Sequence, residues 1–395
     1  MQGKFHVLII GGGIAGHAVA VSEESRPVGF DIRGLWREPW RRRGLWLAPN
    51  GMNVVAALGL ADRLKARASV APESAFRDER GKLLARFSNG GTKYGEPQMS
   101  MMRSDLYAAV TDEIRAQKIP IHHNKRLSRI ERLPDRVIAH FTDGSSAEGD
   151  ILIGADGVHS QTRRQVMLDA PEPEFVGITG IGGAVAMSDI PELSPRESRS
   201  FTFTFTFGPD GFFGFCGGSA GEEMWWANLP REKPYSEAEL KSLSSDVLRK
   251  QLTDRYGDYY QPIPSLIART RDIIALNVFD IQYLPRWYDG RVMLIGEAAH
   301  AVSPNSGQGA SLALEDAMYL CAIAGRITPR PSSVSSRDRK PRVERIVGAG
   351  RRAASDKEIV SPLKSKIRNF MIGMMVRLFG IPGQDWAFRY RIQWE

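Results

Sequence analysis

The chain has 395 residues, which is long enough for one large domain or two coupled ones. With 42% hydrophobic and 25% charged residues, its composition is that of an ordinary globular protein. The formal net charge is +8, and basic residues gather at Arg41–Arg43, Arg163–Arg164 and 337–352. These clusters lack a recognition motif and interleaved aromatic residues, so we expect them to meet anionic cofactors or to form a solvated basic surface, and we expect no nucleic-acid partner.

The sequence also argues against a disulfide framework, a metal site and a membrane span. Cys216 and Cys321 are the two cysteines, too few for a disulfide framework and not spaced as metal ligands. No apolar run approaches the roughly 20 residues that a membrane span needs, and the N-terminus lacks the layout of a signal peptide. We therefore expect a soluble, cytoplasmic protein without a metal.

The N-terminal segment predicts a nucleotide-binding strand–turn–helix unit. Val7–Ile10 is a continuous apolar run, typical of a strand buried on both faces of a parallel sheet. The G-x-G-x-x-G spacing of Gly11, Gly13 and Gly16 follows directly and would permit a tight turn, close approach to a pyrophosphate and close helix packing. The alternative is a glycine-rich turn without a ligand. The candidate cofactor-binding residues here are Gly11, Gly12, Gly13, Ile14, Ala15 and Gly16.

A second parallel strand is expected over Phe30–Trp36. In a dinucleotide-binding unit this strand ends in a carboxylate that binds the adenosine ribose. Trp36 stands at that place, and the nearest carboxylate is Glu38, which would reach the ribose only if the strand carries a bulge. Whether Glu38 or another residue binds the ribose stays open.

The region from Pro171 to Tyr283 is rich in predicted strands. Phe201, Phe203, Phe205 and Phe207 alternate with threonines, which is the period of a strand. The phenylalanines either form one face of a packed core or an aromatic wall over a ligand pocket. We favour the core, because periodic apolar stripes generally pack inward.

Parallel-strand character returns at Arg291–Gly296. The Pro- and Ser-rich residues 327–336 are expected to form a loop or linker, and the remainder has a basic, helical pattern. Its most apolar run, Phe370–Val376, is expected to be a helix docked on the body rather than a membrane anchor. Basic residues at 364, 366 and 368 would suit a peripheral contact, but we expect no membrane contact by this tail.

Three separated motifs together resemble one known family. They are Gly11–Gly16, Gly154-Ala155-Asp156-Gly157-Val158-His159-Ser160-Gln161-Thr162-Arg163, and Gly296-Glu297-Ala298-Ala299-His300 continuing to Ala310. In this order and spacing the chain resembles the single-component FAD-dependent aromatic hydroxylases, the para-hydroxybenzoate-hydroxylase-like group. The likeness spans residues 1 to about 326, and other Rossmann proteins lack the second and third motifs.

The resemblance implies an α/β fold with a Rossmann-like FAD-binding domain, an inserted β-sheet substrate domain and a C-terminal helical tail. The implied FAD-binding segments are 1–70, 99–170 and 285–326; the substrate domain comprises 71–98 and 171–284; the linker and tail comprise 327–395.

The resemblance also assigns roles to single residues. Arg103 matches an arginine that faces the FAD phosphates or ribityl chain. Asp156 and Gly157 match a strand-end motif that supports both FAD and the approach of NAD(P)H. Glu297 stands where the family usually has an aspartate that binds the ribityl hydroxyls, so it keeps the carboxylate but adds a methylene. The loop and helix start beneath the isoalloxazine are matched by Pro304, Gly307, Gln308, Gly309 and Ala310.

The implied chemistry needs little acid–base machinery from the protein. NAD(P)H, a transient co-substrate, reduces the bound FAD; O2 then forms a C4a-hydroperoxyflavin that hydroxylates or epoxidises an aromatic or polyketide-like molecule. Pro304 and Arg43 are candidate pocket residues, and Arg41–Arg43 either meet the nicotinamide cofactor's phosphates or form a solvated loop. The substrate, the choice of NADH or NADPH, and whether the chain is a monomer or a homodimer stay open.

Two alternatives to a monooxygenase remain at this point. One is a related flavoprotein reductase or dehydrogenase that does not use O2. The other is a non-catalytic FAD-binding protein whose site is weakened by Trp36 and Glu297.

Overall fold

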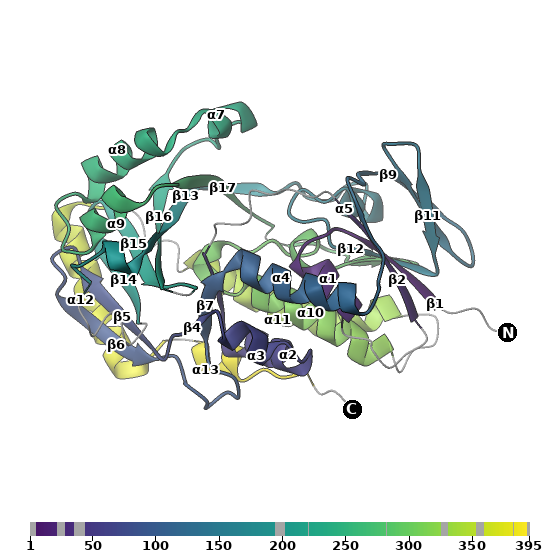
Figure 1. Cartoon of the computed structure of the whole chain (residues 1–395), viewed down its shortest axis with the longest axis horizontal. Coiled ribbons are helices and arrows are strands. Elements are labelled where there is room, and N and C mark those ends of the chain that lie inside the picture. Colours follow the sequence, from purple (N-terminus) through teal and green to yellow (C-terminus); the bar gives the residue numbers. More distant parts are fainter. Residues whose placement is uncertain are drawn as a thin grey trace.

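The computed structural model describes residues 5–21, 28–34, 44–193, 202–219, 221–281, 283–324, 331–352, 359–381 and 383–392. Figure 1 shows an elongated molecule in which strand β1 and the sheet around it lie at one end and a second large sheet lies at the other.

The first sheet is built around β1, as the buried run Val7–Ile10 predicted. Its strand order is β18-β19-β12-β1-β2-β8, and β1 pairs in parallel with β2 and β12. The register places Ile10 beside both Arg33 and Gly154, so the three carboxyl ends meet at one edge. The bounds are β1 Phe5–Ile10, β2 Val28–Gly34, β8 Ile121–His123, β12 Ile151–Gly154, β18 Tyr288–Asp289 and β19 Val292–Leu294.

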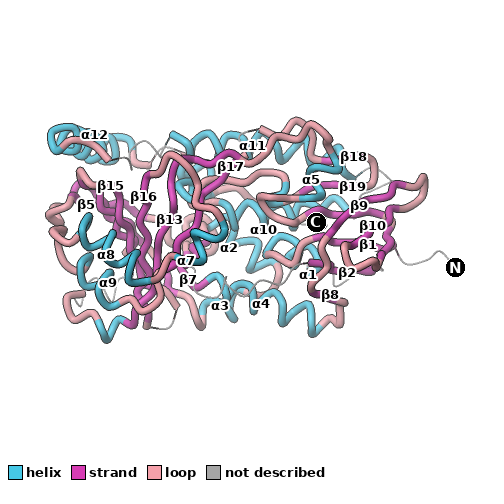
Figure 2. Tube along the Cα trace, turned by 90° about the horizontal axis from the view of Figure 1, so that it is seen from above, coloured by secondary structure: helices cyan, strands magenta, loops and turns pink. Residues whose placement is uncertain are grey.

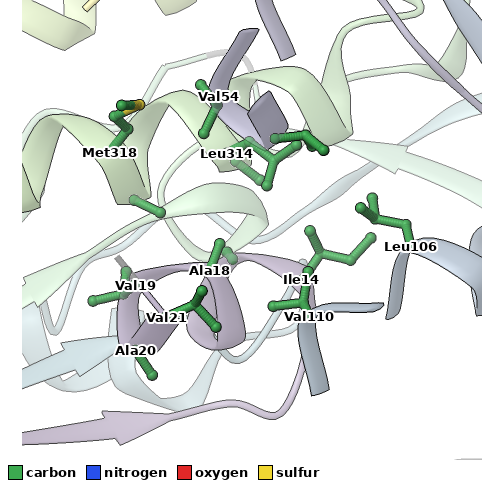
Figure 3. Close-up of a cluster of buried hydrophobic side chains, with 14 of the residues drawn as sticks. Ile14, Ala18, Val19, Ala20, Val21, Val54, Leu106, Val110, Leu314 and Met318 are labelled. Carbon is green, nitrogen blue, oxygen red and sulfur yellow. The ribbon is translucent and has the colours of Figure 1, made fainter. Parts of the chain in front are cut away.

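Helices α1, α4 and α10 form the core packed on this sheet. Every residue of α1 is buried, because α1 lies between α4 and α10 and contacts both. Figure 3 shows Ile14 and Ala18 of α1 close to Val110 of α4 and Leu314 of α10. The bounds are α1 Ile14–Val21, α2 Pro49–Ala57, α3 Ala61–Lys65, α4 Arg103–Ala116, α5 Gln161–Val166 and α10 Gly309–Ala324.

The second large sheet has the order β17-β13-β16-β15-β14-β5-β6 and is antiparallel except for the β14–β5 pair. It joins strands from residues 73–88 to strands from 174–280, and we propose that these segments form the inserted substrate domain. Helices α8 and α9 cover one face through a core around Trp225. The bounds are β5 Glu73–Asp78, β6 Leu83–Ser88, β13 Glu174–Ala186, β14 Phe203–Gly208, β15 Gly211–Gly217, β16 Glu222–Pro230, β17 Ile274–Asp280, α7 Glu237–Ser242, α8 Ser245–Tyr256 and α9 Ile263–Arg269.

Within the described residues, two three-stranded sheets and three short 3-10 turns complete the connections. One small sheet has the order β3-β7-β4 and the other β11-β10-β9. Their bounds are β3 Gly44–Leu47, β4 Ser69–Val70, β7 Met99–Met102, β9 Leu127–Arg132, β10 Val137–Phe141 and β11 Ser146–Gly149. The 3-10 turns are η2 Met187–Asp189, η3 Gly296–Ala298 and η4 Pro304–Ser306.

The alternating phenylalanine segment forms β14. Phe203 and Phe207 are buried, so the prediction that they belong to a core is confirmed. Phe205 is half-buried, and Phe201 lies outside the described residues. Thr204 and Thr206 are buried as well, so β14 is covered on both faces.

The C-terminal part differs from the expected linker and tail. The prediction of a linker over 327–336 is wrong from Pro331, where the long helix α11 begins; proline suits a first helical turn because its missing N–H has no partner there. Helix α11 (Pro331–Arg352) packs on α10, and α12 (Pro362–Phe379) packs on β6 and β14, followed by α13 (Gln384–Phe388). Figure 2 shows α12 along the outside of the second sheet.

None of the helices in the described part of the chain combines the length and the apolar character that crossing a bilayer requires.

Candidate cofactor and active site

A cavity of about 940 Å³ opens at the carboxyl edge of the first sheet. Residues of all three sequence motifs line it, although these motifs are separated by more than a hundred residues each. The predicted site residues in its lining are Gly11, Gly12, Gly13, Ile14, Ala15, Arg103, Asp156, Gly157, Glu297, Gly309 and Ala310.

The glycines of the first turn each meet a different steric demand. Gly11 has a φ of +124°, and a Cβ there would lie 2.2 Å from the carbonyl oxygen of Ala155. A Cβ on Gly16 would lie 2.3 Å from the carbonyl oxygen of Gly11, so α1 packs directly on the turn. At Gly13 a Cβ would meet no atom within 4 Å, so the turn faces open space at the cavity. This is the arrangement that the motif predicts for a turn holding a pyrophosphate.

Basic side chains from several segments surround the cavity. Arg33 at the end of β2 is paired with Asp31, with 2.6 Å between nitrogen and oxygen. Lys125 follows β8 and pairs with Asp143 at the same distance. The cavity-lining cations are Arg33, Arg103, Arg115, Lys125 and Arg126. Apart from Arg103, sequence reasoning missed them, because their approach depends on which elements meet, such as the pairing of β8 with β2 that brings Lys125 and Arg126 close.

A buried histidine lies directly behind the glycine turn. His17 Nδ1 is 2.9 Å from the carbonyl oxygen of Gly13, and its ring contacts that of Tyr107, a cavity-lining residue. Burial lowers the pKa of His17 to about 4, so the imidazole is neutral at physiological pH. It supports the turn without adding charge to it.

The second motif ties the end of β12 to α5. The Asp156 carboxylate accepts hydrogen bonds from the Ser160 hydroxyl and from the backbone N–H of Thr162, 3.0 Å away. Burial raises the pKa of Asp156, while these hydrogen bonds act in the opposite direction. Arg163 is buried and donates to the carbonyls of Val158 and Ala298, so it joins the second motif to the third. Asp156 therefore lines the cavity while its oxygens hold the start of α5.

In the third motif, Glu297 is an exposed side chain between buried neighbours. It belongs to η3, where Gly296 and Ala298 are buried, and it faces the cavity. One Glu297 carboxylate oxygen would be 3.9 Å from a Cβ placed on Gly157. The carboxylate thus lies next to the second motif at the wall of the cavity.

Two acidic residues of α10 anchor the third motif from inside the protein. Asp316 accepts from the backbone N–H of Gly296 and is paired with His300, 2.5 Å away. Burial raises the pKa of Asp316, but the charges of His300 and Arg339 outweigh it and hold this pKa at about 2. Glu315 accepts from Asn50, whose amide also donates to Gln308 at 2.9 Å.

The buried cations that balance this pair come from α11. Arg339 contacts Glu315 at 2.6 Å and Asp316 at 2.9 Å, and Arg342 contacts Glu315 at 2.7 Å. We call Asn50, Gln308, Glu315, Asp316, Arg339 and Arg342 the α10–α11 network. Sequence reasoning placed the basic residues from 337 to 352 on a solvated surface, and that interpretation is wrong for Arg339 and Arg342, which are buried. Their charges are compensated by two carboxylates from another helix.

Within the third motif, the loop before α10 faces Trp46 of β3, which forms an aromatic surface together with Phe203 and Trp226 of the second sheet. Gly307 has a φ of +63°, and a Cβ on it would lie 2.5 Å from the Trp46 indole nitrogen. Trp46 packs on Trp226, with ring centroids 5.0 Å apart, and on Phe203. A 3.4 Å hydrogen bond from Asn228 of β16 to Asn305 of η4 also joins the second sheet to the loop before α10.

Several predicted site residues lie elsewhere than in the cavity wall. Gly16 lies behind the turn, and Gln308 is buried with its side chain directed at Asn50. Pro304 and Gly307 lie in and after η4, outside the cavity lining. Glu38 and Arg43, together with Trp36, Arg41 and Arg42, lie outside the described residues.

The strand order and the glycine turn at a parallel sheet edge define a dinucleotide-binding protein of the doubly wound class. The family model described as "FAD binding domain" matches residues 4–329. The chain therefore belongs to the FAD binding domain family, and the cofactor of this family is FAD.

Characterised relatives are similar over most of their length. The chain is 30% identical to 3-amino-4-hydroxybenzoate 2-monooxygenase of Streptomyces cremeus over 89% of this chain and 87% of that protein. It is 29% identical to 6-hydroxynicotinate 3-monooxygenase of Bordetella bronchiseptica over 82% of this chain and 83% of that protein.

The fold matches solved structures of flavin hydroxylases. Klebsiella pneumoniae HpxO, complexed with FAD and uric acid, superposes with a TM-score of 0.85 and 25% identity, covering 98% of this chain and 97% of that one. A salicylate hydroxylase substrate complex gives a TM-score of 0.80 at 21% identity, over 99% and 97% of the two chains, which shows the shared fold. The prediction of a single-component FAD-dependent monooxygenase, an oxidoreductase with the para-hydroxybenzoate-hydroxylase-like fold, is confirmed.

Proposed function

We propose that this chain uses NAD(P)H and O2 to hydroxylate a small aromatic or heteroaromatic molecule, working in the cytoplasm as a monomer or homodimer. The observation that carries the proposal is the cavity in which the three motifs meet, with the loop before α10 next to Trp46 of the aromatic surface. The relatives' names specify ring hydroxylations of an aminohydroxybenzoate and a hydroxynicotinate. We therefore favour hydroxylation over epoxidation.

The cavity suits FAD in shape and charge. The turn at Gly13 leaves room for the pyrophosphate, and α1 directs its N-terminal amides there. Five basic side chains and three carboxylates, Asp112, Asp156 and Glu297, line the cavity, so the basic residues are in excess by two. An anionic dinucleotide would complement this excess of positive charge.

The protein's contribution to the reaction is binding, orientation and exclusion of water. FAD, when bound, supplies the redox and oxygen chemistry. The N-terminal amides of α10, at Gly309 and Ala310, line the cavity and favour negative charge beside them. The α10–α11 network fixes the start of α10 through Gln308. We propose that a planar substrate ring contacts the half-buried Trp46 and Trp226, which would exclude water from it.

The test is to purify the full chain, measure bound FAD, and screen hydroxylated and amino-substituted benzoates, pyridines and purines for stimulated NAD(P)H oxidation. Oxygenated product formed together with the oxidised nicotinamide supports the proposal. Reduction or dehydrogenation of the substrate without oxygen uptake would instead identify a reductase or dehydrogenase. Absence of bound FAD in every preparation would favour a non-catalytic protein.

Arg103→Ala should weaken FAD binding without unfolding the protein. Arg103 is the first residue of α4 and lines the cavity, so we propose that it contacts the FAD phosphates or ribityl chain. Loss of a hydrogen bond to a charged group costs about 1.5–3 kcal/mol, or roughly tenfold or more in Kd. Titration of the apoprotein with FAD measures this. The control is Arg80→Ala on the exposed β5–β6 turn; equal FAD affinity in both variants would remove Arg103 from the site.

Glu297 variants test the departure from the usual aspartate. We propose that the longer side chain reaches the ribityl hydroxyls from the cavity wall beside Gly157. Glu297→Ala should then lower FAD affinity by roughly tenfold. Glu297→Asp should also bind FAD less tightly, because its side chain is one methylene shorter and its carboxylate would not reach the ribityl hydroxyls. Glu297→Gln keeps the length of the side chain and is the control for this shortening. If all three variants bind FAD as the parent does, Glu297 does not contact the flavin.

A further inference from the structure

Helix α12 packs on the second sheet through its small and polar residues. Ser365, Asn369 and Gly373, spaced four residues apart, are its buried residues. Asn369 donates to the carbonyl of Phe207 at 2.9 Å, and a Cβ on Gly373 would lie 2.9 Å from the carbonyl oxygen of Leu84. The helix is therefore docked on the body, as predicted, but its fully buried residues are small or polar and only Ile372 and Val376 of its apolar residues are half-buried.

The large apolar side chains of α12 face outward. They follow a spacing of three or four residues, which places them on one side of a helix. Phe370 is 70% and Leu378 67% exposed. We call six of them, which share one side of the helix, the α12 stripe: Leu363, Ile367, Phe370, Met371, Met374 and Leu378. Met375 and Phe379 are also exposed and lie beside the stripe.

Basic residues border the α12 stripe on both sides. At 3.6 residues per turn, Lys364 lies on one side of the stripe, and Lys366 and Arg377 lie on the other. All three are exposed, and the sequence from Pro362 to Phe379 contains no acidic residue. An apolar stripe with basic borders is the pattern of a helix that lies in the plane of a membrane interface.

The exposed stripe changes the expectation of no membrane contact by this tail. We propose that α12 docks this protein on an anionic phospholipid surface, with the α12 stripe inserted at the acyl boundary and Lys364, Lys366 and Arg377 at the lipid headgroups. Charge complementarity selects this occupant over a second copy of the chain. Stripe-to-stripe pairing of two copies would bring basic borders together without any carboxylate from either helix, which is unfavourable. The cytoplasmic leaflet is negatively charged and attracts such borders.

The position of α12 agrees with this role. The helix runs along the outside of the second sheet, at the end of the molecule away from β1 (Figures 1 and 2). The glycine turn and the cavity lie at the carboxyl edge of the first sheet, so docking would leave the cofactor site unobstructed. The proposal and the proposed function can therefore fail separately.

Vesicle co-flotation of the full chain tests the proposal. The probes are vesicles of phosphatidylcholine alone and of equal parts phosphatidylcholine and phosphatidylglycerol. The chain should float with the anionic vesicles, and high salt should release much of it. The Phe370→Glu/Leu378→Glu double variant should bind at least about tenfold less, because two anchoring side chains become anionic. Leu168→Glu, a matched control at a 99% exposed leucine away from α12, should bind as the parent does.

A second variant separates charge from apolar anchoring. Lys364→Gln/Lys366→Gln/Arg377→Gln should lose roughly fivefold in binding per removed charge while its fold and FAD content stay unchanged. Failure of the parent to float with anionic vesicles would overturn the proposal. So would equal flotation with neutral vesicles, or a parent dimer by light scattering that the double variant converts to a monomer.

Discussion

Gly11→Ala is expected to prevent stable folding of the first sheet and with it FAD binding. The φ of +124° at this position disfavours any side chain, and the new Cβ would collide with the Ala155 carbonyl and the Asp156 amide. Both obstacles are backbone, so β1 and β12 would have to move apart. We expect a loss of about 3 kcal/mol or more, the upper end of overpacking costs, measured as the midpoint of denaturant unfolding.

Gly13→Ala provides the matched comparison two residues away. Its Cβ would meet no protein atom within 4 Å, so the apoprotein should be as stable as the parent. If the pyrophosphate binds there, however, FAD affinity should fall by roughly tenfold or more, equivalent to about 1.4 kcal/mol. A Gly13→Ala protein with full FAD affinity, or a stable Gly11→Ala protein, would contradict this account of the turn.

Arg339→Met should destabilise the protein by about 3–5 kcal/mol, the cost of breaking a buried ion pair by removing one partner. The Arg339 side chain is 0% exposed. Its removal leaves the buried Glu315 with Arg342 and the buried Asp316 with His300 as their remaining charged partners. Because Asn50 links Glu315 to Gln308 at the start of α10, FAD affinity should fall as well. Thermal unfolding and FAD titration measure the two effects.

Arg337→Met is the control for this substitution. Its side chain is 78% exposed and pairs only weakly with the neighbouring Asp338, so the change should alter stability by less than about 1 kcal/mol. If Arg337→Met and Arg339→Met proved equally stable, the α10–α11 network would not support the fold.

The glycine turn could be predicted from sequence because its residues are dictated by local backbone geometry. The positive φ at Gly11 and the close packing at Gly16 both exclude side chains, so each position requires glycine and the glycine spacing in the sequence reveals the turn. The neighbouring strands could also be predicted, since Ile151–Gly154 and Val292–Leu294 are short apolar runs followed by glycine-containing motifs. The resemblance then assigned both segments to the FAD-binding domain, but the order of the strands comes from the structure.

The cations around the cavity and the α10–α11 network could not be predicted in the same way. Arg115, Lys125 and Arg339 look like surface residues in the sequence, because no local pattern tells a buried, paired cation from a solvated one. Their environment depends on which helices and strands meet in three dimensions. The exposure of the α12 stripe could not be predicted for the same reason: an apolar run predicts a helix face but not whether that face is covered.

The measurement that tests the central claim most directly is turnover of the FAD-loaded chain with an active substrate under isotopically labelled dioxygen. A monooxygenase incorporates one atom of the label into the product, and one NAD(P)H is consumed for each product formed under coupled conditions. Mass spectrometry of the product should therefore show the mass shift of a single labelled oxygen atom. A product that carries oxygen from water, or substrate oxidation without incorporated label, would contradict the account.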